Sequence, residues 1–173
     1  MVQKDNRLAC ALLTVATLGI ARFFSVPQGF VCLVTAFGKY RKKCDPGLGS
    51  CLWFWGIYEE PLDPIPTREQ VQSYENESVF TRDGVNCMID SVVFYTIKDS
   101  FKATFEIENY RGAVESLVQA TLRNECGNLS ARELLAGRQK LADQLRSQLD
   151  KDTAPWGIAV RLVEITDIRM TTN

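Results

Sequence analysis

The feature that most constrains the fold is a change in the spacing of apolar residues near residue 98. From Val85 to Ile97 the side chains alternate between two series, and both series contain apolar residues. Such alternation over 13 positions predicts a long strand with apolar residues on both faces. From Asn109 onward the apolar residues instead recur at helical spacing. A chain whose strands come first and whose helices follow is typical of an α+β fold.

The sequence before the long strand also favours strands and turns. Residues Gly29 to Phe37 are rich in β-branched and aromatic side chains, which favours a strand. A turn is predicted at Asp45-Pro46-Gly47, and three prolines between residues 61 and 66 indicate an extended connector. Short strand-like pieces follow from Glu69 to Phe80, and Arg82-Asp83-Gly84 then predicts another turn.

Two amphipathic helices are predicted next. The first runs from about Asn109 to Glu125 and ends near Gly127. The second begins at a capping box that Ser130 opens, and it carries a stripe of leucines, Leu134, Leu141, Leu145 and Leu149. This stripe is typical either of a coiled-coil seam or of packing against a sheet.

A last strand is predicted from Ile158 to Ile168, after Pro155-Trp156-Gly157 ends the second helix. Its apolar residues change phase at Val163 and Ile165, which indicates a bulge or burial on both faces. The predicted fold is therefore α+β: a mostly antiparallel sheet with two amphipathic helices packed on one side, preceded by a short hydrophobic membrane segment.

Composition argues against catalysis and against nucleic-acid binding. The 20 basic and 21 acidic residues nearly cancel, so no overall charge attracts a phosphate backbone. The chain has no histidine, the commonest general base, and no glycine-rich phosphate loop or nucleophile elbow. Carboxylate pairs such as Glu59 and Glu60, or Glu106 and Glu108, have the pattern of solvated charge. We predict no enzyme activity, no catalytic residues, no cofactor, no metal site and no nucleic-acid partner.

The six cysteines form no C-x-x-C pair, which argues against a zinc site or a thioredoxin-like motif. Cys32 and Cys87 lie in strand-like patterns where a thiol acts as a small core residue. We expect reduced thiols and a domain that faces the cytoplasm. Cys44 and Cys51 flank a turn and would close a short loop in an oxidising compartment.

The amino-terminal segment is a candidate membrane anchor. As a helix, the uncharged run from Leu8 to Ala21 would span only about 21 Å, and extension to Val26 gives about 28 Å, near the roughly 30 Å of a hydrocarbon core. A marginal span, a hairpin or a wedge in one leaflet are all compatible with this length. A cleavable signal peptide and a buried helix are the alternatives.

Candidate membrane residues follow from this interpretation. The predicted lipid contacts of the anchor are Leu8, Leu12, Leu13, Val15, Leu18, Ile20, Phe23 and Phe24. Arg22 would extend to the headgroups, and Cys10 is a candidate for S-acylation or a simple apolar filler.

A second membrane surface is predicted farther along the chain. The aromatic run includes Trp53, Phe54, Trp55 and Tyr58, and a basic cluster of Lys39, Arg41, Lys42 and Lys43 precedes it. Trp and Tyr favour the headgroup level, and basic side chains favour anionic lipids. Core packing is the alternative for the aromatic residues.

Several motifs between residues 27 and 168 occur in a definite order and spacing. They comprise Phe37-Gly38-Lys39-Tyr40 with Pro46-Gly47-Leu48, Arg68-Glu69-Gln70, Thr81-Arg82-Asp83-Gly84-Val85, Asn109-Tyr110-Arg111-Gly112-Ala113-Val114, Thr121-Leu122-Arg123-Asn124 with Gly127, and Trp156-Gly157 leading to Val163-Glu164-Ile165-Thr166-Asp167-Ile168. In this order and spacing they resemble the stomatin/prohibitin (SPFH, or band 7) family, and its stomatin branch most.

The resemblance implies three segments. Residues 1–26 would be the anchor, and residues 27–168 the SPFH domain, with a strand-rich part (27–98) and a helix-helix-strand part (99–168). Residues 169–173 would begin a coiled-coil extension that is missing from this sequence, either because the chain is truncated or because it is naturally short.

The resemblance also implies a function. It is that of a non-catalytic, membrane-associated scaffold that forms homo-oligomers and organises membrane microdomains, including sterol-rich ones. The alternative is a regulatory binding module for a channel, a transporter or a membrane protease.

Overall fold

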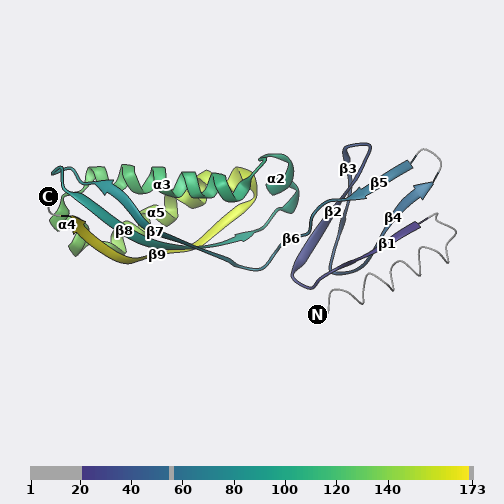
Figure 1. The fold of residues 1–173 in the computed structure, drawn as a ribbon, viewed down its shortest axis with the longest axis horizontal. Helices are drawn as coiled ribbons and strands as arrows, with labels where there is room; N and C mark the ends of the chain where they lie inside the picture. Colours follow the sequence, from purple (N-terminus) through teal and green to yellow (C-terminus); the bar gives the residue numbers. More distant parts are fainter. Residues whose placement is uncertain (1–20, 55–56, 172–173) are drawn as a thin grey trace. The chain divides into compact units, whose positions relative to one another are not determined.

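The structure is a computed structural model that describes residues 21–54 and 57–171; residues 1–20, 55–56 and 172–173 lie outside this description (Figure 1). The chain divides into two compact units, Met1–Arg68 and Glu69–Asn173. We call the described parts of these the strand-rich unit and the helix-covered unit. The resemblance implied a division of the domain after residue 98, where the strand-rich part ends and the helices begin. The compact units of the structure divide after Arg68 instead.

The strand-rich unit is a curved antiparallel sheet. Its strands are β1 (Ala21–Val26), β2 (Phe30–Ala36), β3 (Lys39–Cys44), β4 (Gly47–Phe54), β5 (Ile57–Pro61) and β6 (Ile65–Pro66). They follow the order β1-β4-β5-β2-β3, and β6 pairs with β2. The Lys42 Nζ of β3 donates a hydrogen bond to the Ser50 carbonyl of β4 at 2.6 Å, although two strands separate β3 from β4 in this order. The sheet must therefore curl so that β3 approaches β4.

Curvature explains the burial of β2. Val31, Cys32, Leu33 and Val34 are consecutive residues, so their side chains point alternately to both faces, yet all four are buried. A strand inside a curled sheet has both faces covered, and its sequence then reads as a continuous apolar run.

The prediction of a helix that extends to Val26 is wrong for residues 21–26. Ala21–Val26 form strand β1, which pairs with β4 along its whole length. Val26 is buried, and the ring of Phe24 lies so close to Gly49 that any side chain at that position would collide with it. Cross-strand pairing and this close approach outweigh the apolar character that favoured a helix.

The helix-covered unit contains a second antiparallel sheet, in the order β7-β8-β9. Its strands are β7 (Gln70–Phe80), β8 (Asn86–Ile97) and β9 (Ile158–Thr171). The central strand β8 alternates between half-buried and buried residues from end to end. The buried series is Cys87, Ile89, Ser91, Val93, Tyr95 and Ile97. The long strand predicted from alternation is therefore confirmed.

Helices cover one face of this sheet (Figure 1). They are α2 (Ser100–Phe105), α3 (Tyr110–Asn128), α4 (Ala131–Ala136) and α5 (Arg138–Thr153), and a 3₁₀ turn, η1 (Ala154–Trp156), follows α5. The packing of α3 against β7 and of α5 against β9 places the long helices above the sheet edges. The α+β class and the antiparallel pairing are confirmed, but the strands form two sheets, not one.

The predicted second helix is divided in two. The capping box at Ser130 and Glu133 is present, but α4 ends after one and a half turns and Gly137 separates it from α5. Glycine is a poor helix former, which explains the break. All four leucines of the stripe, Leu134, Leu141, Leu145 and Leu149, are nevertheless buried, so core packing is the correct interpretation of the stripe.

Helix α2 was not predicted. It has six residues, and the Asp99 side chain caps it by accepting hydrogen bonds from the backbone N–H groups of Phe101 and Lys102. Within the described residues, no helix combines the length and the apolar content that a bilayer crossing requires.

Strand β9 contains the irregularity that its change of phase predicted. Its pairing with β8 skips Thr166, between Ile165 and Asp167, and skips Arg161, between Val160 and Leu162. Each skipped residue forms a β-bulge. After a bulge, the side chains that point to a given face of the sheet change from even-numbered to odd-numbered residues or the reverse.

Strand β7 has a bulge of its own, between Tyr74 and Glu77. Asn76 in this bulge has a φ of 57°, and its backbone N–H donates to Asp90 Oδ1 at 2.7 Å. Arg169 of β9 donates to the Asn76 side-chain oxygen at 3.1 Å. Polar contacts across all three strands therefore hold this bulge in place.

Gly157 offers a test of the packing between η1 and α2. It has a φ of 71°, and a Cβ added there would lie 2.7 Å from the Asp99 carbonyl oxygen. We expect Gly157→Ala to lower the free energy of unfolding by about 3 kcal/mol, because backbone strain and a backbone clash add.

Gly84→Ala is the matched control for this substitution. Gly84 has a φ of 76° with nothing within 4 Å of an added Cβ, so only the conformational cost of about 1 kcal/mol is expected. Urea unfolding of both variants measures the difference. Equal losses would contradict the proposed clash.

Candidate membrane-facing surface

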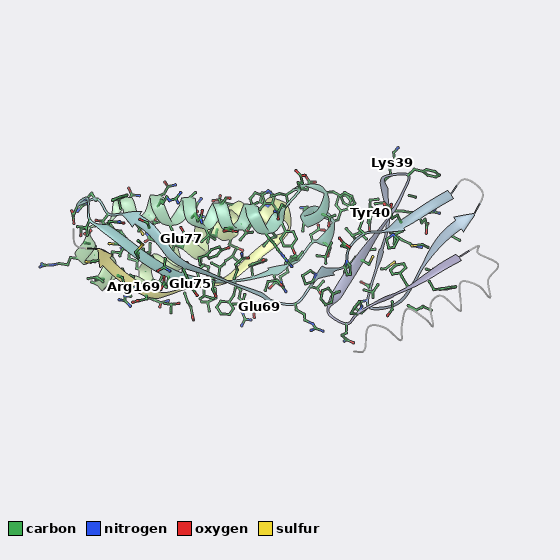
Figure 2. All side chains as sticks on the ribbon, viewed as in Figure 1. Lys39, Tyr40, Glu69, Glu75, Glu77 and Arg169 are labelled. Atoms are coloured by element: carbon green, nitrogen blue, oxygen red, sulfur yellow. The ribbon has the colours of Figure 1, made fainter. Side chains whose placement is uncertain are left out.

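The basic cluster predicted from the sequence lies on one strand, β3, which we call the basic strand (Lys39–Cys44). Its charged side chains are partly exposed: Arg41 to 46%, Lys42 to 37% and Lys43 to 50%. Lys39 is also exposed and lies at the end of β3 next to the β2–β3 turn (Figure 2). The structure therefore brings the four predicted cations together.

Two of these cations are already paired within the unit. Arg41 lies 2.8 Å and Lys42 lies 3.3 Å from the carboxylate of Glu59 on β5. The Glu59 side chain is only 1% exposed and accepts a hydrogen bond from the backbone N–H of Leu52 at 2.9 Å. One buried carboxylate thus joins β3, β4 and β5.

The charge of Glu59 is stabilised in place. Burial raises the pKa of a carboxyl group, but here hydrogen bonds from Leu52 and Lys42 and the charges of Lys42 and Arg41 outweigh this effect. The pKa of Glu59 is therefore below its usual value. Glu59 is thus a structural ion-pair partner, a role that the sequence pattern of a carboxylate pair with Glu60 did not reveal.

The other two cations are more available to a ligand. Lys43 lies 3.9 Å from Asp45, and both side chains are well exposed. Such an exposed pair contributes little and separates at small cost. Lys39 and Lys43 are therefore the members of the basic strand best placed to meet an anionic surface.

The predicted aromatic surface lies at the end of the β4–β5 hairpin. Trp53 pairs with Tyr58 and Phe54 with Ile57, so the aromatic run reverses direction there. The structure describes these four residues by their backbone alone, and Trp55 lies outside the described residues.

The predicted anchor contacts are divided between β1 and the residues outside the description. Phe23 and Phe24 are half-buried in β1, and the backbone of Arg22 pairs with Cys51 in the same sheet. The others, Leu8, Cys10, Leu12, Leu13, Val15, Leu18 and Ile20, lie outside the described residues.

Three cysteines gather in the strand-rich unit as thiols. Cys32 pairs directly with Cys44 across β2 and β3, and Cys51 lies close enough to influence the pKa of Cys32. The partner nearest in register to Cys44 is therefore Cys32, not the Cys51 that sequence spacing suggested. Burial, with smaller contributions from Cys44, Cys51 and Asp63, raises the pKa of Cys32 to about 11.

The described residues contain no group of three or more Cys, Asp and Glu side chains arranged to hold a metal ion. Glu106 and Glu108 are exposed on the segment after α2. Their surroundings give them no feature of an acid and base pair.

Substitution of Glu59 tests the ion-pair arrangement. Because the pKa of Glu59 is lower in the folded chain, its ionised form stabilises the fold at neutral pH, and this contribution disappears as the pH falls below about 4.5. We expect Glu59→Gln to cost on the order of 3 kcal/mol at pH 7, and less in acid.

Urea unfolding across a pH series measures this loss. Glu60→Gln, which changes the exposed neighbour on the same strand, is the control and should have little effect. A cost of Glu59→Gln that stays constant from pH 7 to acid would contradict the role of the ionised carboxylate.

Alkylation tests the thiols. Cys44 is half-buried, whereas burial raises the pKa of Cys126 to about 12 and Cys126 is fully enclosed. We expect iodoacetamide at mildly alkaline pH to label Cys44 at least about tenfold faster than Cys32 or Cys126, because access and thiolate fraction both favour it. Peptide mass spectrometry measures the rates, and equal labelling without urea would contradict this order.

Comparison of the sequence with known proteins identifies the family of this chain. The sequence matches the SPFH domain / Band 7 family over residues 24–173. A mimivirus protein named for the band 7 family, from Acanthamoeba polyphaga mimivirus, is 30% identical over 86% of this chain and 48% of its own length. An uncharacterized protein of Methanothermobacter thermautotrophicus is 33% identical over 79% of this chain and 42% of its own.

A stomatin homolog of Pyrococcus horikoshii is 36% identical over 61% of this chain and 40% of its own length. The chain thus spans less than half the length of these relatives. The family match covers residues 24–68 of the first compact unit and all of the second, and it agrees with the resemblance based on sequence motifs. The chain belongs to the SPFH domain / Band 7 family.

Proposed function

We propose that this protein is a non-catalytic, membrane-associated scaffold whose strand-rich unit lies against the bilayer. The observation that carries the proposal is the family match over residues 24–173. This range includes the basic strand and the β2–β3 and β4–β5 hairpins. The stomatin branch, which the motifs resemble most, is associated with membranes. The domain would face the cytoplasm, a compartment in which cysteines remain thiols.

The surface chemistry of the strand-rich unit supports this proposal. Leu48 on β4 is 65% exposed and Leu52 on the same strand is 41% exposed. They are four residues apart on one strand and therefore share a face, with exposed Ser50 between them. Exposed apolar side chains close to lysines are suited to the boundary between headgroups and acyl chains.

Assembly is the second part of the proposal. We infer homo-oligomers that organise membrane microdomains, as the family resemblance implies. Regulation of a channel, transporter or protease is the alternative, and no contact in the described residues favours it. The absence of histidine supports a role without catalysis.

Membrane fractionation tests the attachment, and the structure determines where the chain should be cut. A deletion of residues 1–26 would remove β1 and leave β4 without its partner, so the deletion should stop at residue 20. We expect the intact chain to pellet with membranes and resist carbonate, and the chain that begins at Ala21 to be extracted, because it lacks the apolar run.

A chain that begins at Pro27 is the control, because it should lose the fold as well. The detergent-extracted intact chain should be larger than its 19.5 kDa monomer if it assembles. Full solubility of the intact chain would refute the membrane proposal, and a monomer would refute assembly by this chain alone.

A further inference from the structure

The β2–β3 hairpin has an unusual residue at its tip. Strands β2 and β3 are joined by Phe37 and Gly38, with φ values of 51° and 75°. Two successive positive φ values match a type I′ turn, whose first position favours Asn, Asp or Gly. A bulky aromatic residue in this conformation is uncommon.

Phe37 is also exposed. Its side chain is 70% exposed, the largest fraction among the exposed large apolar side chains of the described residues. The ring therefore gains little from packing within the unit, while its backbone is held in a left-handed conformation. A residue that is unfavourable in both respects is a candidate for a functional role outside the folded unit.

Asn76 is a useful comparison, because its residue type and its hydrogen bonds explain its positive φ. It is the other non-glycine residue with a positive φ among the described residues, it is of a type that tolerates this conformation, and it makes hydrogen bonds to Asp90 and Arg169. Phe37 has neither of these explanations.

The neighbours of Phe37 indicate the chemistry of its partner. Lys39 follows the turn, and Tyr40 is 42% exposed beside it (Figure 2). An apolar ring at a hairpin tip, followed by a cation and an amphipathic ring, is typical of side chains that lie at a membrane interface. The cation adds affinity for an anionic surface.

We propose that the tip of the β2–β3 hairpin inserts the Phe37 ring between the headgroups of an anionic bilayer, with Lys39 at the phosphate level and Tyr40 at the interface. This inference rests on the proposed membrane association and adds a contact outside the aromatic run that the sequence singled out. Phe37 lies at the transition from β2 to the basic strand, so its insertion would bring Lys39, at the start of that strand, close to the membrane surface.

Photocrosslinking tests the insertion. Benzoylphenylalanine, an aromatic analogue of phenylalanine, replaces Phe37 in the full chain, which is reconstituted with vesicles of phosphatidylcholine and a minor fraction of phosphatidylserine. Replacement of Phe80 is the matched control, because that ring is 65% exposed in the helix-covered unit. After irradiation, mass spectrometry identifies whether each position has bonded to lipid or to protein.

We expect a lipid adduct at position 37, with a yield several times higher than at position 80. An adduct with a second copy of the chain, or with no partner while the chain sediments with the vesicles, would overturn the insertion but leave the membrane proposal intact. A chain that does not sediment with the vesicles would refute both.

A second variant separates insertion from turn strain. Phe37→Asn suits the left-handed position and removes the ring, so the hairpin should fold as well as before or better. We expect vesicles to slow amide exchange at the β2–β3 turn severalfold in the wild-type chain and to have much less effect in Phe37→Asn. Equal slowing in both chains would overturn the role of the ring.

Discussion

The buried carboxylate of Glu59 is the interaction on which the geometry of the strand-rich unit depends. A charged group that is 1% exposed is costly unless donors surround it, and here Arg41, Lys42 and the Leu52 N–H supply them. Since these donors come from β3 and β4, the ion pairs fix the curl of the sheet. The orientation of the basic strand and of the β2–β3 and β4–β5 hairpins within the unit follows from that curl.

Elements determined by local sequence could be predicted. The alternation of β8, the capping box at Ser130 and the leucine stripe each express a rule that acts within a few residues, and the structure agrees with all three. Residues 21–26 could not be predicted, because the preference of β1 for a strand depends on pairing with β4, more than 20 positions away. The division of the strands into two sheets depends likewise on distant pairing.

The candidate surface was predictable only in part. The sequence identified the basic residues. It did not reveal that Arg41 and Lys42 both pair with Glu59, because the sequence pattern does not show whether an acidic residue in a strand is buried. Phe37 was not singled out as a contact residue either. Its importance depends on a φ angle and an exposed fraction, and a sequence provides neither.

The bulges in the helix-covered unit have a consequence for aggregation. Strands β7 and β9 are the two edges of a sheet, and an unprotected edge invites another chain to add a strand. Bulges at Asn76, Arg161 and Thr166 interrupt the row of backbone donors and acceptors on both edges. Neither edge of this sheet therefore offers another chain a long flat strand to extend, which protects the unit against edge-to-edge aggregation.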